Sequence, residues 1–151
     1  MHVRSYIVVV PFWPLGRRCH NGQMLRGQSI WYGHVANSLT MEAVAIRDGV
    51  QIASTSGITR VVIETDEKEV VKLYNDRNQG RSEIMAIIQE IEELSGHLEF
   101  FQLNFVGREA NEGAHLCAKQ ASESRRRCMW INFLPSFLVQ CLQNDCNPAD
   151  Y

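Results

Sequence analysis

The sequence predicts an α/β fold in which a mixed β-sheet is flanked by helices. Short runs of β-branched and aromatic residues alternate with longer segments whose apolar residues recur at helical spacing, in the order β-β-α-β-α-α-β-α. The chain has 151 residues, which suits one domain with a sizeable core. Its 45% hydrophobic and 21% charged residues are typical of a globular protein.

Two strands and a long helix are expected first. Residues 5–12 form a valine-rich run that meets prolines, and residues 24–33 form a second run of apolar and aromatic side chains. Between them, the Asn-Gly pair within residues 20–23 favours a tight hairpin turn. From Met41 to Thr55, apolar residues recur every three or four positions, which predicts a helix.

The ends of this helix also have sequence signals. Either Ser38 or Thr40 can cap its start, because a side-chain oxygen there can accept a hydrogen bond from a free backbone N–H. Gly57 can end it, because glycine adopts the left-handed conformation that follows many helices.

The second half of the chain alternates in the same way. Residues 60–65 form a short β-branched run, typical of a strand covered on both faces. Residues 67–76, 82–94 and 110–123 are predicted helices, and residues 98–107 are a predicted strand. The helix over 82–94 is the clearest, because its isoleucines form one stripe.

Three parts are predicted along the chain: a divergent N-terminal segment over residues 1–20, a domain over residues 21–124, and a C-terminal tail over residues 125–151. The tail contains an apolar stretch, residues 129–143, to which the pattern assigns no place in the fold.

Residues 42–124 are acidic while both flanks are basic. This distribution fits a metal site flanked by phosphate contacts, and it equally fits a solvated acidic surface.

The five cysteines are an odd number without a C-x-x-C pair. They argue against a zinc site or a disulfide framework and favour a reducing, intracellular compartment, the nucleus or the cytoplasm. No apolar run is long enough to cross a bilayer, so no membrane partner is expected. The sequence sets no oligomeric state.

Two acidic residues stand where predicted elements begin or end. Asp66 follows the strand over residues 60–65, at the carboxyl end where open α/β sheets build their sites. Glu42 lies in the first turn of the predicted helix, where an acid also interacts favourably with the helix dipole. Position alone leaves the catalytic and the structural explanation open for both residues.

Three ordered motifs resemble one family. They are the helix start "MEAVAIRDG" with Glu42, the strand end "ETD" at residues 64–66, and "REANEGAH" at residues 108–115. Their order and spacing resemble the plant branch of the RNase H-type domains. Those domains are similar to the RNase H modules attached to the reverse transcriptases of retroelements. The resemblance covers about residues 21–123 and implies an RNase H-like fold.

The resemblance also implies hydrolysis of RNA in RNA–DNA hybrids. In the family, four carboxylates gather around two Mg²⁺ ions, which activate water and stabilise the leaving oxygen. Carried over to this chain, Glu42 and Asp66 match two of the metal ligands. His115 stands where many members have the last aspartate, and its imidazole suits Mn²⁺ better than Mg²⁺. Arg108 and Asn111 are expected to contact nucleic acid.

One family feature is absent from the sequence. The first carboxylate of the family lies on its first strand, but no Asp or Glu precedes Glu42 here. We therefore expect the first strand to be missing or replaced, as in a domain truncated at its N-terminus. Three functions stay open: a ribonuclease with an impaired site, a non-catalytic module that binds hybrids or structured RNA, and a retroelement-derived remnant.

Overall fold

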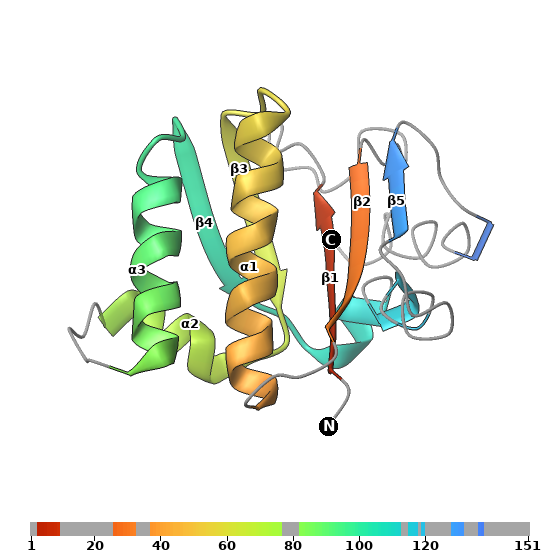
Figure 1. Cartoon of the computed structure of the whole chain (residues 1–151), viewed down its shortest axis with the longest axis horizontal. Coiled ribbons are helices and arrows are strands. Elements are labelled where there is room, and N and C mark those ends of the chain that lie inside the picture. Colours follow the sequence, from red (N-terminus) through yellow and green to blue (C-terminus); the bar gives the residue numbers. More distant parts are fainter. Residues whose placement is uncertain are drawn as a thin grey trace, which may run out of the picture.

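Strands and helices alternate along the part of the chain that the structure, a computed structural model, describes (Figure 1). That part comprises residues 3–9, 26–32, 37–76, 82–112, 115–117, 119, 128–131 and 136–137. The elements are β1 (Val3–Val9), β2 (Arg26–Tyr32), α1 (Ser38–Thr55), β3 (Arg60–Thr65), α2 (Lys68–Asp76), α3 (Glu83–Ser95), β4 (Phe100–Phe105), the 3₁₀ helix η1 (Arg108–Asn111) and β5 (Cys128–Ile131). Residues 112, 115–117, 119 and 136–137 also have helical backbone.

The described strands form two sheets. In the first, β1 pairs with β2 and β2 pairs with β5, both antiparallel. In the second, β3 and β4 are parallel, so that Arg60 lies opposite Phe100 and Thr65 lies opposite Phe105. A parallel pair needs a crossover connection, and α2 and α3 provide it. The predicted mixture of strand directions with flanking helices is therefore confirmed, although β1 and β3 belong to separate sheets.

The core lies where α1 and α3 pack against each other and against β3 and β4 (Figure 1). Val50, Ile88 and Ile91 are at most 1% exposed, and the isoleucine stripe predicted for α3 faces this core. Each such side chain contributes roughly 1.5–3 kcal/mol by its removal from water. The alanines of α1, including Ala45 and Ala53, let the helix lie close to β3.

The start of α1 differs from the prediction. The helix begins at Ser38, and its cap is Asn37, whose side-chain oxygen accepts a hydrogen bond from the backbone N–H of Thr40 at 2.8 Å. Neither predicted residue, Ser38 nor Thr40, is the cap. Glu42 consequently lies in the second turn, and the first turn contains no acidic residue. The interaction with the helix dipole offered above for Glu42 is thus wrong, because that effect fades beyond the first turn.

Other predicted boundaries hold within a few residues. The strand over 60–65 is confirmed to the residue, and Gly57 has the positive φ of 74° expected after the end of α1. Ser82 stands at the start of α3, but its side chain makes no capping hydrogen bond. The turn predicted within residues 20–23 lies outside the described residues. No described helix is long and apolar enough to cross a membrane.

Strand β5 comes from the tail that the sequence pattern left unassigned. It pairs with β2 in a register that places Ser29 opposite Cys128, and Arg26 opposite Ile131. Trp130 of this strand also contacts Phe137 edge to face, with ring centroids 5.6 Å apart. Strands β1 and β5, from opposite ends of the chain, therefore lie on the two sides of β2 in one sheet (Figure 1).

Ending the chain at residue 127 should destabilise the protein, because it removes β5 and leaves that edge of β2 unpaired. We expect the free energy of unfolding to fall by roughly 2–4 kcal/mol, since a short ladder of hydrogen bonds worth about 1 kcal/mol each is lost. Urea unfolding followed by circular dichroism measures the change. A chain that ends at residue 137 keeps β5 and its aromatic contact and should resemble the full chain. Equal stability of the two shortened chains would contradict this role of β5.

Candidate nucleic-acid and metal site

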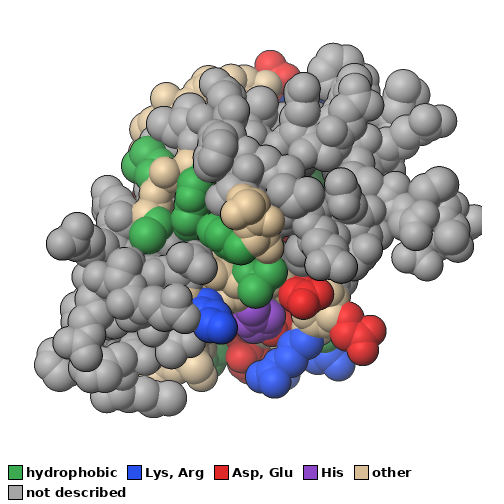
Figure 2. Space-filling view, turned by 90° about the vertical axis from the view of Figure 1, so that its right-hand side faces the viewer, with side chains coloured by type: hydrophobic (Ala, Val, Ile, Leu, Met, Phe, Trp, Pro, Cys, Tyr) green, Lys and Arg blue, Asp and Glu red, His purple; other side chains and the backbone are tan. Residues whose placement is uncertain are grey.

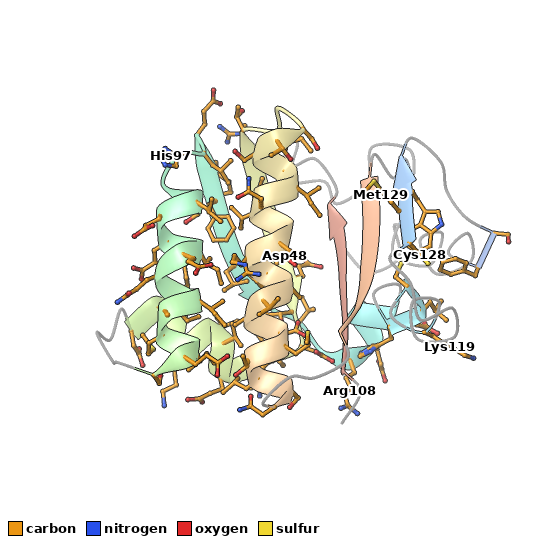
Figure 3. The ribbon with its side chains drawn as sticks, in the orientation of Figure 1. Asp48, His97, Arg108, Lys119, Cys128 and Met129 are labelled. Atoms are coloured by element: carbon orange, nitrogen blue, oxygen red, sulfur yellow. The ribbon has the colours of Figure 1, made fainter. Side chains whose placement is uncertain are left out.

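The carboxyl ends of β3 and β4 and the amino end of α1 lie at the same end of the molecule (Figure 1). The two strands are parallel, so their carboxyl ends meet at one edge. Asp66 follows the last residue of β3 directly, and Glu42 lies near the start of α1. Arg108, which follows β4, lies at this end as well (Figure 3). The topology alone thus gathers several of the predicted site residues.

The side chain of Thr65 joins three segments at this end. Its hydroxyl donates a hydrogen bond to the carboxylate of Glu42 at 2.6 Å. The same oxygen accepts a hydrogen bond from the backbone N–H of Glu67 at 3.1 Å. Thr65 is completely buried, so both partners of its hydroxyl come from the protein. Because a hydroxyl has a single proton, the bond to Glu67 leaves that proton for Glu42.

The carboxylate of Glu42 lies in an environment that disfavours its charge. Burial raises the pKa of Glu42, and the neighbouring carboxylates of Asp66 and Glu67 add to the rise. The hydrogen bond from Thr65 and the nearby imidazole of His115 act in the opposite direction. Burial is the largest of these effects on the pKa of Glu42, and repulsion by the carboxylate of Asp66 is a smaller one.

Asp66 is contacted by the imidazole of His115 and by the guanidinium of Arg108. Nε2 of His115 lies 3.1 Å from Oδ2 of Asp66, within hydrogen-bond distance. Nε of Arg108 lies 3.8 Å from the same oxygen, and the Arg108 side chain is 88% exposed. An ion pair so exposed contributes at most about 1 kcal/mol, so Arg108 remains available to a ligand. Figure 2 shows histidine, acidic and basic side chains gathered on one face of the molecule.

The structure brings together most of the residues that the sequence singled out. Glu42, Asp66, His115 and Arg108 form one connected cluster. Asn111 is the last residue of η1, and its side chain lies outside the described residues. Thr65 was missed, although the signal was present: the motif at residues 64–66 has a hydroxyl residue between its two acids.

The capacity of the cluster for metal ions is limited. Among the described residues, no group of three or more His, Cys, Asp or Glu side chains is placed to hold a metal ion. Glu42 and Asp66 supply carboxylate oxygens, which are the ligands that hard divalent ions prefer. Mg²⁺ commonly takes one or two carboxylates and fills its other positions with water. Glu42 and Asp66 are a donor set of that size and chemistry.

Replacement of Thr65 by valine should destabilise the fold. The change keeps the shape of the side chain but leaves the carboxylate of Glu42 without its hydrogen bond, at a cost of roughly 1.5–3 kcal/mol. Urea unfolding at neutral pH measures the loss. Thr65→Ser, which keeps the hydroxyl, should retain more stability than Thr65→Val. Thr55→Val, on the exposed end of α1, should change stability by less than about 0.5 kcal/mol. A neutral Thr65→Val would show that the hydroxyl does not anchor Glu42.

The raised pKa of Glu42 predicts a pH dependence of stability in metal-free buffer. The pKa of Glu42 is higher in the folded chain than its ordinary value of 4.5. Between pH 4.5 and this raised pKa, the folded chain therefore binds more protons than the unfolded chain. Stability should therefore fall as pH rises from 4.5 through the raised pKa. Glu42→Gln should flatten this fall, whereas Glu93→Gln, on an exposed position of α3, should leave it unchanged. Superimposable pH profiles for wild type and Glu42→Gln would contradict the burial of this charge.

Solved structures of known proteins share this fold. RNase H1 from the halophilic archaeon Halobacterium salinarum NRC-1 matches with a TM-score of 0.58 at 13% identity, over 80% of this chain and 95% of that chain. The N-terminal RNase H domain of a Mycobacterium tuberculosis protein, solved as a fusion with maltose binding protein, matches with a TM-score of 0.54 at 15% identity. That match covers 80% of this chain and 91% of the other. At such identities the likeness shows the fold alone.

Sequence comparison adds the family. A search of curated proteins finds no match. The family model described as reverse transcriptase-like matches residues 17–121, which include α1, β3, β4 and the cluster around Asp66 but not β1. Since this match spans more than half of the chain, the protein belongs to the reverse transcriptase-like family and contains an RNase H-like domain.

Proposed function

We propose that this protein binds RNA–DNA hybrids and hydrolyses their RNA strand in a reaction that needs a divalent metal ion. Membership of a family with the RNase H-like fold supports nucleic acid as the partner. The observation that carries the proposal is the cluster at the carboxyl end of β3. There Glu42 is anchored by Thr65 and lies beside Asp66. We also propose that the chain is related to the RNase H modules of plant retroelements, on the basis of the order of its three motifs.

Glu42 and Asp66 are the proposed metal ligands. Their mutual repulsion contributes to the raised pKa of Glu42, and a divalent cation between them would relieve it. Such an ion, when bound, supplies an activated water and offsets the charge that develops on the phosphate. Mg²⁺ fits the carboxylate oxygens, and Mn²⁺ would gain a further ligand if the imidazole of His115 turned from Asp66 toward the ion. Two carboxylates suit one ion rather than the pair of ions held by four carboxylates in the resembled family.

The other residues of the cluster position these ligands or the nucleic acid. Thr65 fixes the direction of the Glu42 carboxylate. His115 can donate a hydrogen bond to Asp66 and thereby orient it. Arg108 extends into solvent at the edge of the site, where a guanidinium can contact the phosphates of a bound strand. We propose a similar contact for Asn111, which ends the same 3₁₀ helix.

Cleavage of an end-labelled RNA–DNA hybrid by the purified protein tests this proposal. We expect cleavage in Mg²⁺ or Mn²⁺, with Mn²⁺ the more effective. Glu42→Gln and Asp66→Asn should each lower the rate on the order of a hundredfold or more, because each replaces a carboxylate ligand by an amide. Hybrid binding, followed by fluorescence anisotropy on the same samples, should survive both changes.

Matched substitutions elsewhere control for the loss of a charge. Glu93→Gln on α3 and Asp76→Asn at the end of α2 change exposed acids of the same types, and both variants should cleave like wild type. Cleavage that persists at the wild-type rate in Glu42→Gln and Asp66→Asn would overturn the assignment of these residues.

A second function is favoured by one specific observation. No acidic residue precedes Glu42 in the sequence, so the described cluster contains fewer carboxylates than the resembled family uses. A module that binds hybrids or structured RNA without cleaving them fits this deficit. Binding without cleavage in both metals would establish this function in place of the first. A folded protein that neither binds nor cleaves would support a retroelement-derived remnant.

A further inference from the structure

Phe105 is exposed at the edge of the candidate site. It is the last residue of β4, and 43% of it is accessible to solvent, although it belongs to the apolar face of that strand. Leu103, two residues earlier on the same face, is buried in the core. The aromatic ring therefore continues the apolar face of β4 from the core into solvent.

Its position places Phe105 beside the carboxylate cluster. Phe105 lies opposite Thr65 in the parallel register of β3 and β4. Opposite residues of such a pair project from the same face of the sheet, and from that face the Thr65 hydroxyl reaches Glu42. The backbone N–H of Val106 also donates to the carbonyl of Thr65 at 2.9 Å, which fixes the two strand ends to each other. Thr65 thus lies between the Phe105 ring and the proposed metal ligand Glu42.

A cation accompanies the ring. Nζ of Lys68, at the start of α2, lies 4.7 Å from the centroid of the Phe105 ring. An exposed cation–π contact of this kind contributes only about 0.5–1 kcal/mol. The long stem of Lys68 can therefore swing away from the ring at little cost and direct its ammonium toward a phosphate.

An exposed phenyl ring next to an ammonium suits a particular form of nucleic acid. Phenylalanine has no hydrogen-bonding group, so it recognises the flat face of a base without regard to sequence. In a duplex those faces are stacked on neighbouring pairs, whereas in a single strand they are free. The ring and the ammonium together fit one unpaired nucleotide, with the base on Phe105 and a phosphate on Lys68.

We infer that Phe105 and Lys68 form a stacking subsite for an unpaired nucleotide, next to the carboxylate cluster. The inference rests on the proposed binding of hybrids and refines it. The preferred substrate is a hybrid that continues into a single-stranded extension, which runs from the cluster across the end of β4. A purely structural function, in which the Lys68 stem shields an apolar ring, would stabilise the fold without affecting this preference.

Fluorescence anisotropy with two labelled hybrids tests the inference, one blunt and one extended by unpaired thymidines. Phe105→Leu should lose roughly tenfold in affinity for the extended hybrid and nothing for the blunt one, because a stacked base is lost. Phe105→Trp should retain the affinity, and its added tryptophan fluorescence should be quenched by the extended hybrid. Lys68→Gln should weaken binding of the extended hybrid by a smaller factor.

Met129→Leu is the matched control, because Met129 of β5 is 41% exposed, nearly as much as Phe105, and lies on a different strand (Figure 3). It should bind both hybrids like wild type. Equal affinity of Phe105→Leu and wild type for the extended hybrid, or an equal loss in Met129→Leu, would overturn the subsite and leave the proposed function standing. A wild-type protein that binds neither hybrid would overturn the proposed function together with the subsite.

Discussion

The hydroxyl of Thr65 is the contact on which the geometry of the candidate site depends. It joins the end of β3 to α1 through Glu42 and to the entry of α2 through the N–H of Glu67. Because this hydroxyl is completely buried, loss of either bond would leave a polar group without a partner in a region that excludes water. The bond also favours the charged form of the Glu42 carboxylate and so partly offsets the rise in its pKa that burial causes. One small side chain thus ties the local fold to the chemistry of the site.

The side chains of the site become more exposed and less constrained with distance from the hydroxyl of Thr65. Glu42 lies on the buried side and is held by a short hydrogen bond. Asp66 is 16% exposed in its side chain and lies at the boundary, while His115 and Arg108 approach it from solvent. Ligands that must hold an ion in one geometry benefit from the rigid side, since little reorganisation is then needed. Long exposed side chains such as Arg108 can follow the backbone of a flexible strand.

The scaffold explains how Glu42 and Asp66 come to lie at one end of the molecule. Strands β3 and β4 are held by the core beneath α1 and α3, so the strand ends that carry Thr65 and Asp66 have fixed positions. Strand β1 belongs to the other sheet, and its residues include neither Asp nor Glu. That sheet is completed by β5 from the opposite end of the chain. The family match begins after β1, so the part of the scaffold that resembles the family is the part that carries the cluster.

The sequence by itself determined the elements that local periodicity specifies. The strand over 60–65, the isoleucine stripe of α3 and the placement of Asp66 at a strand end all follow from residues close together in the chain. Only the tertiary structure decided that Thr65 meets Glu42, 23 positions away, and that Asp66 meets His115, 49 positions away. It likewise decided that four residues of the tail become β5. Periodicity reports on neighbours along the chain, whereas these contacts depend on how the core brings distant segments together, and no short window of sequence contains that information.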